Sequence, residues 1–363
     1  MQNTRAVHVI DHLEPGGAQT LLRTLTAARP LDRVIALHSS GSAADLASEF
    51  PDVEILARRR YSILLILARL VRVVLRDRKR AIFVAHLDAS TLFLCLLRRL
   101  VNFRLVVTLH AIQDQWPAWY RASFRNVIFA ADHVISGGRR AYDELLALGF
   151  PDDRITLIPI GTSRSPDSDA GTETDIRKEL GIAADQPIFL NVARMVPGKG
   201  QVHLVRAMAL VPDGVAVIVG DGPELSRLRE ETARLGLQER VRFCGRRTDL
   251  DRFYASARAF VMPCLDESMG VVVYDALVYK LPVVAYASGT IGEIVKDGEN
   301  GYLMQPDSDA LAAALRKVLA KETEFRFLPA DTYSARTMID RHNALYLALQ
   351  GKWPDLAGHP IDG

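Results

Sequence analysis

The stretch "IFLNVARMVPGKGQVHLVRAM", residues 188–208, contains a complete strand–turn–helix unit. The first six residues are mostly apolar and predict a buried strand that ends at Ala193. Arg194 and Lys199 then flank a Pro-Gly turn, and a helix is expected to begin near Gln201. Near-continuous apolar strands that alternate with helices are typical of parallel sheets covered on both faces. The stretch therefore predicts an α/β fold.

The same alternation occurs twice along the chain. At roughly 100–200 residues per domain, a chain of 363 residues suggests two domains. We expect two Rossmann-like, doubly wound domains that face an interdomain cleft, because such folds bind ligands outside the carboxyl ends of their strands. The first set of candidate strands covers 6–10, 33–37, 81–86, 104–110, 133–137 and 155–160, and the second covers 188–193, 215–220, 241–245, 259–263 and 282–286.

The best domain boundary is the segment 161–175, which is rich in Ser, Thr, Gly, Pro and Asp and lacks apolar periodicity. We therefore expect one Rossmann-like domain over 1–165 and a second over 166–332. The tail, 333–363, has apolar residues at helical spacing. It is expected to form a helix that returns to the first domain.

Composition narrows the class of protein. With 49% hydrophobic and 24% charged residues, the chain is expected to be globular. The three cysteines, Cys95, Cys244 and Cys264, are scattered and form no C-x-x-C pair, which argues against a disulfide framework and against zinc. Literal D-x-D triplets occur at 167–169, in the expected linker, and at 249–251 and 307–309, where they look like helix caps. We expect no metal and no cofactor.

No membrane span or signal peptide is expected. The amino terminus is polar, and the longest apolar stretch, 61–75, is interrupted by Arg69 and Arg72 and is shorter than the ~20 residues that a bilayer requires. The concentration of positive charge in the first half of the chain favours a cytoplasmic protein that is peripheral on the inner face of the cell membrane.

The basic residues concentrate in the first half. Residues 1–165 contain 22 Lys and Arg against 15 Asp and Glu, although the whole chain has a net charge of only +2. Nine basic residues and one acid, Asp77, lie between 58 and 80, and Arg98, Arg99 and Arg104 continue the pattern. A basic amphipathic helix is typical of a membrane-surface element, so 58–80 and 98–104 are expected to dock on anionic lipid. The alternative is a core helix with a solvated basic face. No nucleic-acid partner is expected.

Two carboxylates, Glu267 and Asp275, lie eight positions apart in "DESMGVVVYD". The next strand begins only at 282, and a crossover between parallel strands needs a dozen or more residues, so 270–280 is predicted to be a helix. At about 1.5 Å per residue the two carboxylates would lie about 12 Å apart along its axis. That is too far for a glycosidase pair, whose carboxyls are about 5–9.5 Å apart. It suits the two hydroxyl-bearing ends of one extended ligand.

Two segments could bind phosphate. Arg194 and Lys199 lie beside a helix start and could hold a diphosphate, although a solvated basic loop is the alternative. In "DHLEPGGAQTLL", Gly16 and Gly17 would free two backbone N–H groups at a helix N-terminus, although the pair could also be a structural turn. Neither segment is a G-x-G-x-x-G or P-loop motif.

These pieces, in this order, resemble the retaining glycosyltransferases of the GT-B fold, family 4. The resemblance covers about residues 6–350 and is strongest over 188–304. In the first half, "LEPGGAQTLL" looks like the family's Gly-rich donor-phosphate loop and "VVTLHA" like its active-site histidine segment. The motifs of the second half are "NVARMVPGKGQ", "VGDGPE", "VRFCGRRTDLDRFYASARAFVMPCLDESMGVVVYDALVYKLPVVA" and "GTIGEIVKDGENGYLM".

The resemblance implies that a nucleotide-diphosphate sugar is bound in the interdomain cleft. It also implies that the domain over 1–165 binds the acceptor and the domain over 166–332 the nucleotide sugar. Arg194 and Lys199 would hold the diphosphate, Glu267 the transferred sugar and Asp275 the ribose. The family motif is usually E-x7-E, so the shorter Asp275 is a departure. The implied catalytic set is His110, Glu267, Arg194 and Lys199, and the implied donor-binding set adds Gly16, Gly17, Arg246, Gly270, Val271 and Asp275.

The function that follows is transfer of a hexose, with retention of configuration, to a lipid-linked or membrane-presented glycan. Two alternatives stay open from the residues. One is a non-catalytic subunit that binds a sugar nucleotide or a partner, which Asp275 favours. The other is a GT-B epimerase that acts on a similar donor.

Overall fold

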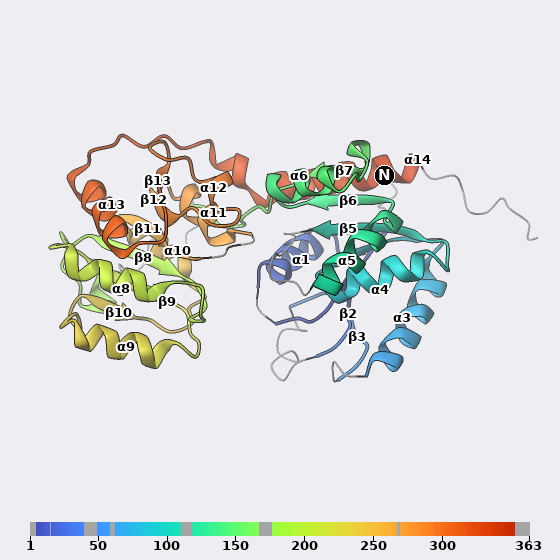
Figure 1. The fold of residues 1–363 in the computed structure, drawn as a ribbon, viewed down its shortest axis with the longest axis horizontal. Helices are drawn as coiled ribbons and strands as arrows, with labels where there is room; N and C mark the ends of the chain where they lie inside the picture. The colour runs from blue at the N-terminus through green and yellow to red at the C-terminus, as the bar shows by residue number, and fades with distance from the viewer. Residues whose placement is uncertain are drawn as a thin grey trace, which may run out of the picture. The chain divides into compact units, whose positions relative to one another are not determined.

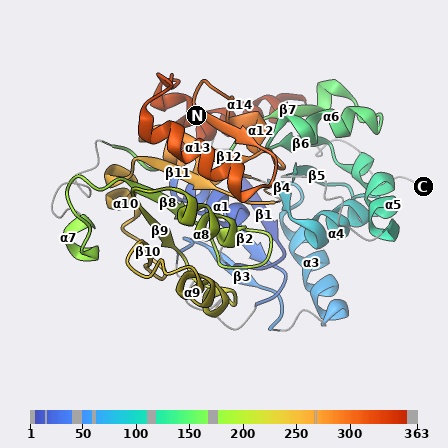
Figure 2. The same ribbon diagram turned by 60° about the vertical axis from the view of Figure 1, so that its left-hand side comes forward.

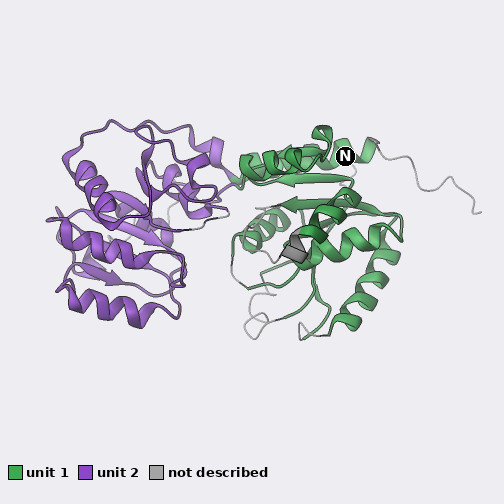
Figure 3. Cartoon of the chain, in the orientation of Figure 1, with its two compact units in different colours: residues 1–160, 335–363 green, residues 161–334 purple. Residues whose placement is uncertain are grey.

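The computed structural model describes residues 5–14, 16–39, 49–58, 62–109, 118–166, 176–265, 267 and 269–352. The chain forms two compact units, which Figure 3 distinguishes by colour. Unit 1 consists of residues 1–160 and 335–363, and unit 2 of residues 161–334. The chain was expected to divide after 165 and after 332, and the observed divisions lie after 160 and 334.

Unit 1 is built on a seven-stranded parallel sheet with the order β3-β2-β1-β4-β5-β6-β7 (Figure 1). Its elements are β1 (Arg5–Ile10), α1 (Gly17–Ala28), β2 (Arg33–Ala36), β3 (Val53–Ile55), α3 (Ile63–Asp77), β4 (Ala81–His86), α4 (Asp88–Arg98), β5 (Arg104–Leu109), α5 (Ala118–Val127), β6 (His133–Ser136), α6 (Arg139–Ala147), β7 (Ile155–Leu157), α14 (Ala335–Lys352) and the 3₁₀ turns Ile128–Ala130 and Asp152–Arg154.

Unit 2 is built on a six-stranded parallel sheet with the order β10-β9-β8-β11-β12-β13, and Figure 2 shows its helices along the sheet. Its elements are α7 (Ile176–Leu180), β8 (Ile188–Val192), α8 (Gln201–Leu210), β9 (Val215–Val219), α9 (Leu225–Arg234), β10 (Val241–Phe243), α10 (Leu250–Ser256), β11 (Ala259–Met262), α11 (Val271–Val278), β12 (Val283–Tyr286), α12 (Ile291–Ile294), β13 (Gly301–Met304), α13 (Ser308–Ala320) and the 3₁₀ turn Ala330–Tyr333.

The two doubly wound α/β folds are confirmed. Each expected strand coincides with an observed strand, and the segment 270–280 forms helix α11. Strands β3 and β13 were not predicted. Both are short edge strands: every residue of β3 and all but the first of β13 are only partly buried, so neither has a clear apolar run.

Alternate strand residues pack on opposite faces of each sheet. Val7 and Val9 of β1 belong to one hydrophobic cluster, and Ile10 belongs to another. Every residue of β4 and of β8 is buried, as parallel strands covered on both faces require. In each sheet the order of strands reverses once, between β1 and β4 in unit 1 and between β8 and β11 in unit 2. Ligands of open α/β sheets bind at such switch points.

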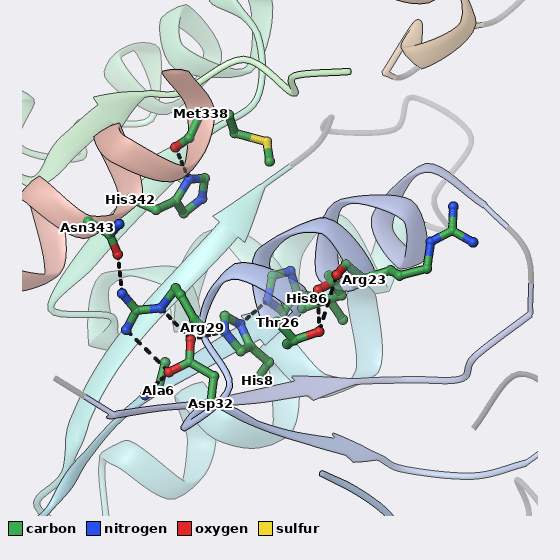
Figure 4. Close-up of polar contacts among 11 residues, drawn as sticks. Ala6, His8, Arg23, Thr26, Arg29, Asp32, His86, Met338, His342 and Asn343 are labelled. Carbon is green, nitrogen blue, oxygen red and sulfur yellow. Dashed lines mark hydrogen bonds and ion pairs between the residues drawn. The ribbon is translucent and has the colours of Figure 1, made fainter. Parts of the chain in front are cut away.

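Helix α14 is joined to the rest of unit 1 by buried polar groups (Figure 4). Asp32 is almost fully buried, and its carboxylate accepts from the Ala6 N–H at 2.9 Å and from the Arg29 Nε–H at 2.5 Å. His8 Nε2 lies 3.3 Å from the same carboxylate. The Arg29 guanidinium also donates to the Asn343 side-chain oxygen of α14. A chain of charged and polar contacts therefore runs from β1 to the C-terminal helix.

The pKa values within this network follow from burial and charge. Burial alone would raise the pKa of Asp32, but the hydrogen bond and charge of His8 and the hydrogen bond from Arg29 lower it. Burial lowers the pKa of His342 to about 4, and the nearby charges of His8 and Arg29 act in the same direction. His342 Nδ1 lies 2.9 Å from the Met338 carbonyl oxygen. The network therefore combines an ionised carboxylate with a neutral histidine at neutral pH.

Candidate functional site

The loop after β8 lies against the end of β11, at the switch point of unit 2. Leu265 N–H donates to the Gly198 carbonyl at 2.8 Å. Gly200, which precedes α8, has φ of +71°, and a Cβ there would lie 1.8 Å from the Pro263 carbonyl oxygen. Only glycine allows this close approach, because a side chain would collide with backbone. The approach brings the basic turn of the β8 loop to the carboxylate of the β11 loop.

Lys199 and Glu267 form an ion pair across the switch point. Lys199 Nζ lies 2.8 Å from Glu267 Oε2, and the two side chains are 23% and 12% exposed. The two residues come from loops that follow neighbouring strands, β8 and β11. The sequence predicted both as ligands of one donor, and the structure brings them together.

Backbone groups hold Glu267 in place from two sides. The N–H groups of Met269 and Gly270 lie 3.3 and 3.2 Å from Glu267 Oε1. The Glu267 carbonyl accepts from the Thr290 N–H at 2.9 Å. A Cβ on Gly289 would lie 1.9 Å from that carbonyl oxygen, so this turn after β12 also depends on a glycine with positive φ. Glu267 is therefore fixed by α11 and by the turn before α12.

Both members of the pair are charged at neutral pH. Burial alone would lower the pKa of Lys199, but the charge of Glu267 raises it above its ordinary value. Burial alone would raise the pKa of Glu267, but the charge and hydrogen bond of Lys199 and the N–H groups of Gly270 and Met269 lower it. The nearby positive charge of Arg194 opposes protonation of Lys199. The site therefore holds fixed charges of both signs.

Four other predicted donor residues lie in unit 2. Arg194 is exposed, and its carbonyl accepts from the Gln201 side chain of α8 at 3.0 Å. Gly270 precedes α11 with φ of +62°, and Val271 is its first residue. Arg246 is exposed and lies in the loop after β10, next to Gly245. Their donor contacts stay predictions.

Asp275 makes contacts that the sequence did not predict. It is 6% exposed, and its carboxylate accepts from the Thr162 hydroxyl. Arg164 Nε lies 3.3 Å from Oδ2, and the Tyr254 hydroxyl lies 3.5 Å from the same oxygen. Burial raises the pKa of Asp275, although the hydrogen bonds from Thr162 and Arg164 and the charge of Arg164 act against this rise. A contact between Asp275 and a ribose also stays a prediction.

In unit 1, the two predicted glycines lie at the switch point between β1 and β4. Gly16 is the extended N-cap of α1, and Gly17 is the first residue of the helix. Gly16 is exposed, and its carbonyl accepts from the Thr20 N–H at 3.0 Å. Asp11, at the end of β1, accepts from the N–H groups of Ala89 and Ser90 at the start of α4. The predicted active-site histidine, His110, lies outside the described residues.

The two D-x-D triplets in the described part of the chain lie at the starts of helices. Asp307 is the N-cap of α13 and accepts from the Asp309 N–H at 2.9 Å. Asp249 is at the N-cap position of α10, but its carboxylate pairs with Arg247 and Arg252. The triplet at 167–169 lies outside the described residues. Among the residues that are described, no group of three or more His, Cys, Asp or Glu side chains could hold a metal ion.

Sequence reasoning missed the contacts that Thr162, Arg164 and Tyr254 make with the second carboxylate, and the ion pair of Arg164 with Asp251. Arg164 Nη1 lies 2.7 Å from Asp251 Oδ2, so one guanidinium contacts both Asp251 and Asp275. Arg164 and Asp275 are 111 positions apart, and no local pattern connects them. The only sign of this contact in the sequence was the presence of an arginine, Arg164, within the polar segment 161–175.

Comparisons with known proteins agree with the two α/β units. A family model described as Glycosyltransferase Family 4 matches residues 5–165, and one described as Glycosyl transferases group 1 matches residues 172–328. The solved structure of HepE from Anabaena in complex with UDP has a TM-score of 0.82 at 21% identity, over 95% of this chain and 100% of HepE. That likeness shows the fold.

Two curated relatives extend the comparison. The chain is 33% identical over 244 residues to the GDP-mannose-dependent alpha-(1-6)-phosphatidylinositol monomannoside mannosyltransferase of Mycolicibacterium smegmatis, a match that covers 62% of this chain and 63% of the relative. It is 26% identical over 314 residues to the alpha-D-kanosaminyltransferase of Streptomyces kanamyceticus, over 75% of this chain and 80% of that relative. The chain thus spans less than two thirds of the length of the mannosyltransferase.

Proposed function

We propose that this chain, which is of the GT-B, family 4 glycosyltransferase type, transfers a hexose from a nucleotide-diphosphate sugar to an acceptor. The observation that carries the proposal is the Lys199–Glu267 ion pair at the switch point of unit 2. It combines a cation for a diphosphate with a carboxylate for sugar hydroxyls, on two loops that backbone contacts hold together.

The charges suit departure of a nucleoside diphosphate. When the bond between the sugar and the diphosphate breaks, negative charge builds on the leaving group. Lys199, the exposed Arg194 and the N-terminus of α8 present positive charge from the same loop. Fixed charges of this kind stabilise the transition state because they need no rearrangement when the reaction occurs. We assign the diphosphate to Arg194 and Lys199 and the transferred sugar to Glu267.

The remaining assignments complete the donor site. The backbone N–H groups of Gly16 and Gly17 would approach the phosphates, Arg246 would border the base, and Gly270 and Val271 would line the loop around Glu267. The family resemblance supports attack by the acceptor from the face that the leaving group departs from, with retention of configuration. It also supports His110 beside the sugar or the acceptor. Gly16 and Gly17 follow β1 and form the start of α1, a position at which backbone N–H groups can bind phosphate.

The exposed face of α3 supports an acceptor at a membrane surface. Ile63, Leu64 and Leu65 in its first turn are 51%, 84% and 45% exposed, although the helix is packed against the core through Ile66 and Leu70. Exposed arginines and a lysine follow along the same helix and just after it: Arg69, Arg72, Arg76, Lys79 and Arg80. Apolar residues beside clustered cations are typical of helices that bind anionic bilayers. Within the described residues, no helix is both long enough and apolar enough to cross a bilayer.

Vesicle binding tests the membrane part of the proposal. We expect the protein to bind phosphatidylserine-containing vesicles at low salt. Replacing Arg78, Lys79 and Arg80 with alanine should weaken this binding by about tenfold or more, because each cation near an anionic surface contributes about 1 kcal/mol to binding. The matched control is Arg139→Ala with Arg140→Ala, which removes exposed cations from α6. Leu64→Ser should also weaken binding. Equal binding by all variants in a sedimentation assay would refute docking through α3.

Turnover tests the catalytic part. The protein is incubated with UDP-sugars and GDP-sugars and with lipid-linked glycan acceptors, and release of nucleoside diphosphate is measured. We expect release with one donor class and its loss in Glu267→Ala. The productive donor should also raise the melting temperature in a concentration-dependent way, because it binds only the folded state. Donor binding without release, across all acceptors, would instead favour a non-catalytic sugar-nucleotide-binding subunit.

A further inference from the structure

Asp275 lies at the centre of a buried cluster formed by residues from distant parts of unit 2. Its carboxylate accepts from Thr162 and lies beside the Arg164 guanidinium, which also contacts Asp251. The Tyr279 hydroxyl donates to Asp251 at 2.6 Å and lies 3.1 Å from the Ser165 carbonyl. The three charged side chains are 8–22% exposed. Removing one partner would leave another charge buried and unpaired, which is strongly destabilising.

The same cluster holds both points at which the chain enters and leaves unit 2. Unit 2 begins at Gly161 and ends at Ser334. The Thr162 N–H donates to the Tyr333 carbonyl at 2.8 Å, and Thr162 pairs with Ser334 in a parallel bridge. The Tyr333 ring also packs against Tyr274 of α11, with centroids 5.6 Å apart. The two ends of unit 2 are therefore joined to each other and to α11.

Helix α11 connects this cluster to the candidate donor site. Asp275 lies near the middle of the helix, and Gly270 precedes its first residue. The Gly270 and Met269 N–H groups donate to Glu267, the carboxylate assigned to the sugar. A displacement of α11 would therefore move both donors that orient Glu267. An eight-residue helix that is buried along most of its length transmits such a displacement as a rigid body.

We propose that Asp275 is a positioning residue, which anchors the two ends of unit 2 to α11 and thereby orients Glu267, rather than a ligand of the donor ribose. The shorter aspartate suits this role, because it keeps the carboxylate close to the helix, where Thr162 and Arg164 meet it. The inference rests on the proposed function only for the role of Glu267.

Three measurements on Asp275→Asn and Arg164→Ala test the inference. We expect each variant to lower the melting temperature of unit 2 by about 6–12 °C in calorimetry, and the double variant to lower it little further. We expect deuterium uptake at the Met269 and Gly270 amides to rise at least tenfold in both single variants. We also expect the ratio of the dissociation constants for UDP and 2′,3′-dideoxy-UDP, and for the GDP pair, to stay within twofold of the wild-type ratio in Asp275→Asn.

Controls separate the anchor from general destabilisation. Arg234→Ala removes an exposed arginine that pairs with Glu231 on α9 and should change neither melting nor uptake. Thr162→Val removes only one hydroxyl and should act in the same direction as Asp275→Asn, with a smaller effect, if the stronger variants do not fold.

Two results would overturn the inference. Lower melting without faster exchange at Met269 and Gly270 would show that the cluster does not act on the Glu267 loop. A ratio of the UDP to the 2′,3′-dideoxy-UDP dissociation constant that lies below one in the wild type and rises towards one in Asp275→Asn would show that Asp275 binds the ribose. The first two measurements need no nucleotide, so they decide the anchor even if the chain proves to have no transferase activity.

Discussion

Replacing Lys199 with methionine should lower kcat/KM for the donor by about 100- to 1,000-fold, the usual effect of removing one fixed donor of positive charge from a transition state. The substitution keeps a long side chain but removes the charge that lies 2.8 Å from Glu267. It also leaves the Glu267 carboxylate partly buried without its partner, so the pKa of Glu267 should rise. The measurement is the initial rate of nucleoside diphosphate release across donor concentrations, with the melting temperature recorded for each variant.

The matched control is Lys178→Met, which removes an exposed lysine from α7 in the same unit. Because Lys199 and Glu267 act as one pair, the double variant Lys199→Met with Glu267→Ala should lose little more activity than the worse single variant. A loss of less than about threefold in a Lys199→Met protein that melts normally would contradict the role of this cation.

Replacing Asp32 with alanine should lower the free energy of unfolding of unit 1 by about 3–5 kcal/mol, as expected when one partner of a buried ion pair is removed. Asp32 is 1% exposed, and its loss would leave Arg29 without its carboxylate and the Ala6 N–H without its acceptor. Asn343 and the Tyr346 ring, whose centroid lies 5.1 Å from the guanidinium, would still contact Arg29 from α14, but the link from Arg29 through Asp32 to β1 would be lost. The packing of α14 on α1 should therefore loosen in Asp32→Ala.

Tryptophan fluorescence during urea unfolding is suited to this measurement. All three tryptophans, Trp116, Trp119 and Trp353, belong to the sequence of unit 1. Asp52→Ala is the control, because its side chain is 48% exposed and pairs with Arg5 and Arg33 at 3.6 and 3.5 Å. An exposed pair contributes about 1 kcal/mol or less. An Asp32→Ala midpoint no lower than that of Asp52→Ala would refute the contribution of the buried network.

The central strands and the donor loops could be predicted because their signals are local. Residues 188–193 are apolar except for Asn191, and the cations of the following turn lie within a few positions of the strand. Glu267 likewise follows a buried strand closely. The switch-point rule then places the ends of neighbouring central strands together. For Lys199 and Glu267 this was sufficient, since the sequence order and the fold class determine where both residues lie.

The edges and the long-range polar contacts could not be predicted in the same way. Strand β3 has Glu54 at its centre and is only partly buried, so it lacks an apolar run. Asp275 was assigned to a ligand because a helical carboxylate near a loop gives no sign of what faces it inside the unit. Its contacts with Thr162 and Arg164 span more than a hundred positions. Such pairings depend on tertiary packing and have no period that a sequence displays.

The discontinuity of unit 1 has a consequence for synthesis on the ribosome. Its last helix, α14, is encoded after the whole of unit 2, so 160 residues of unit 1 emerge long before the helix that packs on α1. At about 5–20 residues per second, making residues 161–334 takes roughly 10–35 s. During that interval the surface that later receives α14 is bare, while unit 2 can already fold as a continuous segment. Unit 2 is thus able to complete its fold before unit 1.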